Sequence, residues 1–176
     1  MRTATFALFI GVAYLAAGIL GMVPDALQPL PPDAPPTTFT VLYGNLLGLF
    51  PVNVLHSAVH LVIGLVGIAA WQMDHVWHRM TSPRTYARAL AVLYGALALL
   101  GLIPGLNTLG GLLPLYGHDV WLHLGTAILA AYFGWRSVVE IERRAAEKVD
   151  RREQAIPVEH ERRYGHSDRR IPGSEV

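Results

Sequence analysis

The stretch that decides the fold is residues 52–73, which read VNVLHSAVHLVIGLVGIAAWQM and contain no Asp, Glu, Lys or Arg. An α-helix rises about 1.5 Å per residue, so a run of this length is enough to cross the hydrocarbon core of a bilayer. Three other runs are also long and apolar: residues 3–23 carry no charge, residues 85–103 contain Arg88, and residues 119–139 contain Asp119 and Arg136 near their ends. The sequence therefore predicts four membrane-spanning helices, at about residues 3–23, 52–73, 85–103 and 119–139.

The composition also separates this chain from soluble proteins. Apolar residues make up 52% of the 176 residues and charged residues only 15%, whereas a soluble domain carries about 25% charged residues. The net charge of +1 argues against a nucleic-acid binder, and the apolar content argues against a disordered chain. The absence of cysteine excludes disulfides, thiolate nucleophiles and Cys-ligated metal sites.

The basic residues predict the orientation of the spans. Segments 24–51 and 104–118 contain no Lys or Arg, whereas Arg2, Arg79 and Arg84 border the opposite ends of the helices. Under the positive-inside rule the N-terminus, the middle loop and the C-terminus are cytoplasmic. We therefore expect a membrane domain at 1–139 and a charged cytoplasmic tail at 140–176, helical at first and disordered from Pro157 onward.

The chain contains an internal duplication. Residues 12–24 and 92–104 match at six of thirteen positions at an offset of 80, including a Tyr and a Pro. Residues 54–56 and 121–123 share a Leu-His pair at an offset of 67. The predicted fold class is an all-α, integral membrane four-helix bundle with a parallel two-helix repeat about an axis along the membrane normal.

The first external loop differs from the spans because it is rich in proline. Its five prolines between residues 25 and 38 predict an extended, non-helical segment. Residues 39–50 are apolar but too short to span, and we expect them either to lie flat on the outer surface or to dip in as a re-entrant segment.

Polar side chains line one face of two predicted spans. On residues 52–73, Asn53, His56 and His60 follow helical spacing, and on residues 119–139, Asp119 and His123 do the same. Both helices enter from the outside, so these side chains are expected close to the outer face. Ionisable residues within a membrane are costly, which makes this cluster the candidate ligand site.

Two tyrosines are expected near the middle of the membrane. Tyr14 and Tyr94 occupy equivalent positions on stripes of small residues in the first and third spans. Small residues at this spacing allow helices to approach closely, and each phenol needs a partner, for which the histidines are candidates.

Three functions remain open for these residues. The preferred interpretation is a non-enzymatic membrane protein whose His/Asn/Asp cluster is structural or binds a small ligand. The second is a redox or metal-binding protein, with His56, His60 and His123 as candidate ligands of a transition metal or haem. The third is an accessory subunit of a larger complex or a transporter that oligomerises, in which case the partners are the lipid bilayer, other membrane subunits or copies of the chain.

The polar motifs carry a resemblance to a known family. Asn53-Val54-Leu55-His56, followed by His60 and Gly64, together with Asp119 and Leu122-His123, resemble the bacterial four-span membrane proteins of the domain-of-unknown-function family 4383. The resemblance covers about residues 3–139. It implies a multi-pass protein of the bacterial inner membrane and singles out the polar residues without assigning them an activity.

Overall fold

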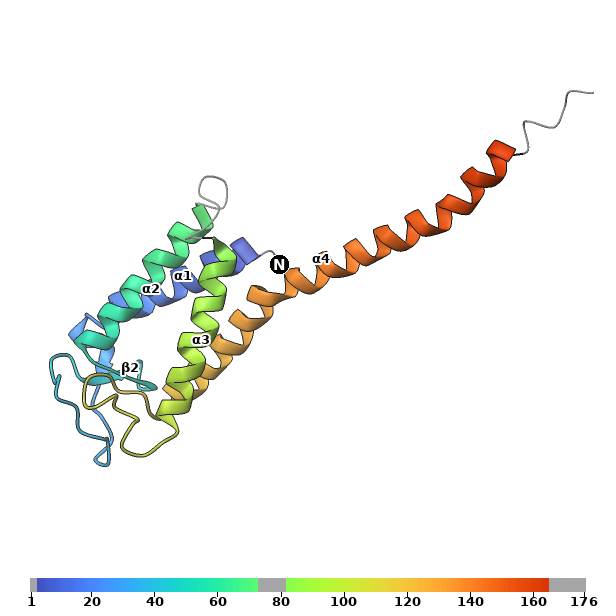
Figure 1. The fold of residues 1–176 in the computed structure, drawn as a ribbon. Coiled ribbons are helices and arrows are strands. Elements are labelled where there is room, and N and C mark those ends of the chain that lie inside the picture. The colour runs from blue at the N-terminus through green and yellow to red at the C-terminus, as the bar shows by residue number, and fades with distance from the viewer. Residues whose placement is uncertain (1–2, 73–81, 165–176) are drawn as a thin grey trace, which may run out of the picture. The chain divides into compact units, whose positions relative to one another are not determined.

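The computed structural model describes residues 3–72 and 82–164, and these residues are mostly helical (Figure 1). Four long helices account for most of them: α1 (Thr3–Leu20), α2 (Val54–Gln72), α3 (Pro83–Gly101) and α4 (His118–Tyr164). The chain divides into two compact units, Met1–Arg136 and Ser137–Val176, and the candidate site lies entirely in the first. The predicted middle loop, apart from its last residues, and the end of the tail at 165–176 lie outside the described residues.

Helices α1 and α2 are in close contact because glycines face each other where they cross. A Cβ atom added to Gly64 would lie 2.5 Å from the backbone nitrogen of Leu15, and one added to Gly11 would lie 2.8 Å from that of Ile68. Real Cβ atoms do not approach backbone this closely, so the two helices can pack at this distance only with glycine at these positions.

An apolar core fills the end of the first unit at which α1 begins. Phe6 of α1 stacks on Phe133 of α4, with ring centroids 4.7 Å apart. All four helices contribute to this cluster, which consists of Phe6, Ala7, Tyr14, Ala70, Tyr86, Ala87, Leu90, Tyr94, Ala127 and Ala130. We call the part formed by Phe6, Ala7, Ala70, Tyr86, Ala87 and Ala130 the apolar core.

The two long connections gather at the opposite end of the helices (Figure 1). We call residues 21–53 and 102–117 together the loop cap. The first connection contains the one-turn helix η1 (Pro24–Ala26) and three short antiparallel strands in the order β1 (Leu27–Gln28), β2 (Gly44–Leu46) and β3 (Phe50–Val52). The prediction of an all-α fold did not include this sheet. Its edge strand β3 tolerates Pro51 because an edge strand does not need every backbone donor.

The two connections are tied to each other within the loop cap. The Thr38 backbone N–H donates to the Gly111 carbonyl at 2.7 Å, and the hydroxyls of Tyr43 and Tyr116 are 2.8 Å apart. Residues 44–46 and 50 of the apolar segment 39–50 take part in the sheet. This segment therefore pairs with its own loop, which satisfies backbone groups that would otherwise lack partners.

Helices α1 and α2 are the two described helices that are long and apolar enough to cross a membrane. Only 28% and 33% of their most apolar windows are buried, whereas a core helix of a soluble protein is mostly buried. The third and fourth predicted spans, in α3 and the first part of α4, stay a prediction. They carry more charge, with Arg84 and Arg88 near the start of α3 and Asp119 near the start of α4.

The second unit contains the rest of α4. Arg143 and Glu147, four residues apart and both exposed, form an ion pair with 3.4 Å between Nη1 and Oε1. The helix continues through Pro157 to Tyr164, which is farther than the expectation of disorder from Pro157. The missing N–H of a proline removes one helical hydrogen bond but does not end a helix whose neighbouring Glu, Arg and Ala residues favour it.

Candidate functional site

Asn53 closes the N-terminal end of α2 and ties both halves of the loop cap to it. Its Oδ1 accepts a hydrogen bond from the His56 backbone N–H at 2.9 Å, which is the geometry of a helix N-cap. Its Nδ2 donates to the Phe39 carbonyl at 3.1 Å and to the Leu112 carbonyl at 2.9 Å. All of its side-chain polar atoms are therefore used for structure.

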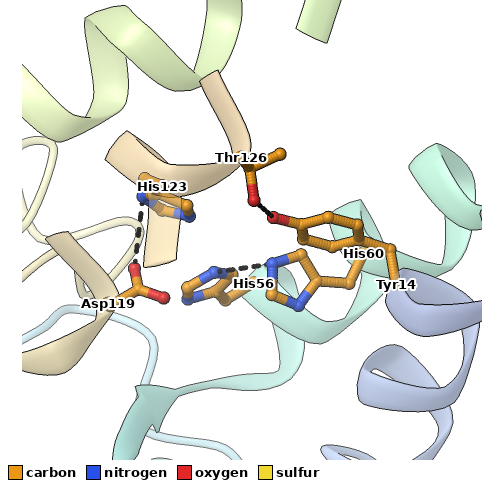
Figure 2. A network of polar contacts seen from close by, with 6 residues as sticks. All are labelled: Tyr14, His56, His60, Asp119, His123 and Thr126. Carbon is orange, nitrogen blue, oxygen red and sulfur yellow. Dashed lines mark hydrogen bonds and ion pairs between the residues drawn. The ribbon is translucent and has the colours of Figure 1, made fainter. Parts of the chain in front are cut away.

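His56 and His60 point into the interior one and two turns below this cap. Both are buried, and their Nε2 atoms are 3.2 Å apart, so one ring donates a hydrogen bond to the other (Figure 2). The spacing of four residues places both rings on the same face of α2. Ser57, next to His56, is also completely buried.

Helix α4 brings Asp119 and His123 to the same place. The two are four residues apart and both are buried, with 3.4 Å between His123 Nδ1 and Asp119 Oδ2 (Figure 2). This contact has the distance of an ion pair but not the alignment of a hydrogen bond, since neither atom has a hydrogen-bond partner. The ring centroid of His123 is 6.0 Å from that of His56, so the two helices meet at their histidines.

Tyr14 and Tyr94 complete the cluster from α1 and α3. The Tyr14 hydroxyl lies 2.9 Å from Thr126 Oγ1, and its ring lies edge-on to His60 at 4.9 Å (Figure 2). The Tyr94 ring contacts His123 at 4.8 Å and Tyr14 at 5.1 Å. The structure thus brings all seven predicted residues together. Asn53 lies at the edge as a helix-cap residue, and each of the other six contacts at least one other member of the group. We call His56, His60, Asp119, His123, Tyr14 and Tyr94 the polar cluster.

The polar cluster leaves many of its polar atoms without partners. In the part of the chain that the structure describes, the buried side-chain atoms without a hydrogen bond are His56 Nδ1, Ser57 Oγ, His60 Nδ1, Tyr94 OH, Asp119 Oδ1, Asp119 Oδ2 and His123 Nδ1. Each such atom costs about 1–3 kcal/mol, and a concentration of them at one point needs an explanation. All belong to the polar cluster or, in the case of Ser57, to the residue beside it.

Three of these residues have the arrangement of metal ligands. His56, His60 and His123 each offer one ring nitrogen, and these atoms all lie within 4.8 Å of one another. Neutral imidazole is a common ligand for transition metals. A porphyrin fits this place less well, because it needs a flat space around its metal, whereas His60 contacts His56 at 4.4 Å and Tyr94 contacts His123.

The sequence did not reveal the tyrosine pair of the loop cap. Tyr43 donates its hydroxyl proton to the Pro35 carbonyl at 2.6 Å and lies against Tyr116. Burial, and after it the hydrogen bond with Tyr43, raises the pKa of Tyr116 above its ordinary value. Residues 46–50 and 112–116 are weakly similar in sequence, but this similarity does not include Tyr43.

Comparison with known proteins supports the resemblance seen in the motifs. The chain belongs to the family described as Domain of unknown function (DUF4383), whose model matches residues 4–136. No curated protein and no solved structure matches the chain. The family description assigns no activity, so the function has to be argued from the geometry of the polar cluster.

Proposed function

We propose that this member of the DUF4383 family is a non-enzymatic protein of the bacterial inner membrane that spans it four times and binds a small polar ligand in the polar cluster. The observation that carries the proposal is the set of buried, unpartnered polar atoms directly beneath the loop cap. Folding without a ligand would leave these atoms desolvated and unpaired, whereas a bound ligand with complementary groups would satisfy them.

The distribution of apolar side chains supports four spans. All four helices expose large apolar residues on their outward faces while the polar cluster is buried, which is the reverse of a soluble protein. These exposed residues include Phe9, Val12, Ile19 and Leu20 on α1, Val62, Leu65 and Val66 on α2, Val92, Leu93 and Leu99 on α3, and Trp121, Leu122, Leu124, Ile128 and Leu129 on α4.

The orientation that we propose places the loop cap outside and both termini in the cytoplasm. Arg88, near the end of α3 opposite the cap, donates its Nε–H to the Gly134 carbonyl at 2.9 Å and lies over the Trp135 ring at 5.6 Å. An arginine paired with a tryptophan is typical of a membrane interface, and basic residues favour the cytoplasmic side.

Contacts between equivalent residues support the internal repeat. Tyr14 and Tyr94, equivalent at an offset of 80, contact each other, and so do His56 and His123, equivalent at an offset of 67. Residues related by a two-fold axis meet their own counterparts only when they lie next to that axis. The polar cluster would therefore lie on the axis of the repeat, as ligand sites of repeat-built membrane proteins do.

The topology is directly testable because the chain contains no cysteine. Single cysteines at the exposed positions Thr40 and Leu106 should react with a membrane-impermeant maleimide in intact cells. Cysteines at Thr85 and Val149, also exposed, should react only after the membrane is permeabilised. Labelling of Thr85→Cys in intact cells, or protection of Thr40→Cys, would contradict the proposed orientation.

The ligand site is testable by native mass spectrometry of the full chain released from detergent. The wild-type protein should carry a bound mass that the double variant His56→Leu/His60→Leu lacks. The variant His118→Leu should retain this mass, because His118 begins the same helix as His123 but is exposed. If the wild-type protein carries no bound mass under gentle activation, the polar cluster is a packing feature and the proposal fails.

A further inference from the structure

The three histidines of the polar cluster converge on one point from two helices. His56 and His60 come from α2 and His123 from α4, and all three are at most 4% exposed. Their candidate ligand nitrogens lie within 4.8 Å of one another. Three imidazoles without a neighbouring cation or bulk water form a donor set that is costly when empty and favourable around a metal ion.

The distance within the α2 pair already matches a metal site. Two nitrogens bound to a tetrahedral zinc ion at about 2.0–2.1 Å are about 3.4 Å apart. His56 Nε2 and His60 Nε2 are 3.2 Å apart, so their separation suits two ligands of one ion once each ring turns its lone pair towards a common point. Histidines separated by four residues on one helix face are a recurrent zinc-binding arrangement.

His123 supplies the third nitrogen, and Asp119 determines which one. The Asp119 carboxylate lies 3.4 Å from His123 Nδ1. A turn of the His123 ring would align its Nδ1–H with this carboxylate and leave the Nε2 lone pair for the metal, which is how metal-bound histidines are usually oriented. Figure 2 shows Asp119 and His56 next to each other below the His123 ring. The candidate nitrogens lie within 4.8 Å of one another, whereas two ligands of a tetrahedral zinc ion are about 3.4 Å apart, so the His123 ring would have to move towards the α2 pair.

We infer that the ligand of the polar cluster is a divalent transition metal ion of the zinc class, bound by His56, His60 and His123, with Asp119 as a positioning residue. The inference rests on the proposed function, because it takes the polar cluster to be a ligand site and names the ligand. Imidazole nitrogen without thiolate or a second carboxylate suits Zn²⁺ and its neighbours in the first transition row, and does not suit Mg²⁺ or Ca²⁺.

Tyr94 and the loop cap lie next to the proposed ligands. The Tyr94 hydroxyl is buried without a hydrogen bond, and its ring lies against His123. Tyr94 therefore adds a further buried polar group beside the third proposed ligand. The loop cap covers the site, with Asn53 joining both of its segments one turn above His56. Such a covered site favours slow metal exchange.

The test uses the full chain, purified in detergent without a polyhistidine tag, stripped with a chelator and then titrated with ZnCl2. The wild-type protein should bind one equivalent of Zn²⁺, and its thermal midpoint should rise with the free Zn²⁺ concentration. Co²⁺ in place of Zn²⁺ should give the visible absorption bands of a tetrahedral nitrogen site. These readouts need only the wild-type protein, so they do not depend on a variant that folds.

Matched variants locate the site. His60→Leu and His123→Leu should lose stoichiometric Zn²⁺ binding, whereas His118→Leu should bind like the wild type. Asp119→Asn should keep one equivalent but bind it about 10–100-fold more weakly, since the amide holds the His123 ring less firmly. An Asp119→Asn variant with wild-type affinity would overturn the positioning role, and loss of binding in His118→Leu alone would overturn the site.

The failures of the two proposals can be told apart. If Zn²⁺ and Co²⁺ do not bind, but native mass spectrometry shows an organic mass that is absent from His56→Leu/His60→Leu, the metal inference is wrong and the ligand site stands. A Soret band in the purified protein would have the same consequence, with haem as the ligand. If neither a metal nor any other bound mass is found, both proposals are overturned.

Discussion

The apolar core and the polar cluster lie towards opposite ends of the same four helices and meet at Tyr14 and Tyr94, and both are almost completely buried. In the apolar core, Phe6 stacks on Phe133, and the Tyr86 hydroxyl donates to the Ile63 carbonyl at 3.2 Å. In the polar cluster, the Nδ1 atoms of all three histidines and both carboxylate oxygens of Asp119 have no hydrogen-bond partner. Packing explains the first region fully. The second region holds groups that packing alone would not favour, and this difference is the reason for proposing a ligand site there.

The largest loss of stability should come from a substitution where α1 and α2 cross, since both helices contribute to the apolar core and to the polar cluster. Replacing Gly64 by Ala places a methyl group against the backbone of Leu15, which forces α1 and α2 apart. We expect a loss of about 3 kcal/mol in the free energy of unfolding, measured by denaturant titration in mixed micelles. Gly125→Ala, with open space around the added methyl group, should be neutral or slightly stabilising. Equal effects of the two substitutions would show that the crossing is not tight.

Substitution of Asn53 tests the residue beside the polar cluster whose side-chain polar atoms all have hydrogen-bond partners. Asn53→Ala removes the helix cap and two ties to the loop cap, and should cost about 2–3 kcal/mol in the same titration. Asn53→Asp keeps the capping oxygen and should cost less. Ser82→Ala removes the N-cap of α3 alone and should cost about 1 kcal/mol. If Asn53→Ala costs no more than Ser82→Ala, the ties to the loop cap contribute nothing.

Substitution of His56 and His60 tests the polar cluster itself, in which several polar atoms have no hydrogen-bond partner. In chelator-treated protein, His60→Leu should lower the free energy of unfolding by about 2 kcal/mol, because it leaves His56 Nε2 unpaired. The double variant His56→Leu/His60→Leu should cost less than the single variant, since it removes both partners. Thermal unfolding in detergent measures both. A double variant that loses at least as much as the two single variants together would mean that the rings stabilise the fold by packing alone.

The smallest effect should be a pH dependence at the loop cap. The pKa of Tyr116 is raised by burial and by its hydrogen bond to Tyr43, so the folded protein holds this proton more tightly than the unfolded chain. The resulting stabilisation is complete below the ordinary tyrosine pKa of about 10 and is lost as the pH rises through the folded-state pKa. The absorbance difference at 295 nm between wild type and Tyr116→Phe should titrate later than a free tyrosine. A titration near pH 10 would contradict this.

The sequence by itself determined the mostly helical fold and the family, and it singled out the residues of the polar cluster. Long uncharged runs leave the backbone no alternative to helix in lipid, and the spacing of His56 and His60 puts them on one face whatever packs against it. The polar motifs were equally local, so the DUF4383 resemblance could be identified from Asn53, His56 and His60 before any contact was known.

The tertiary structure alone determined which residues of different helices and loops contact one another. The spacing of Asp119 and His123 does not reveal that α4 brings them to the α2 histidines, because that depends on how four helices pack. Nor does it show that Asn53 is a cap residue rather than a ligand, since its partners at Phe39 and Leu112 are backbone carbonyls of loops far away in the chain. The small sheet of the loop cap was missed for the same reason: its strands are two or three residues long, and such strands are stabilised by their neighbours rather than by their own sequence.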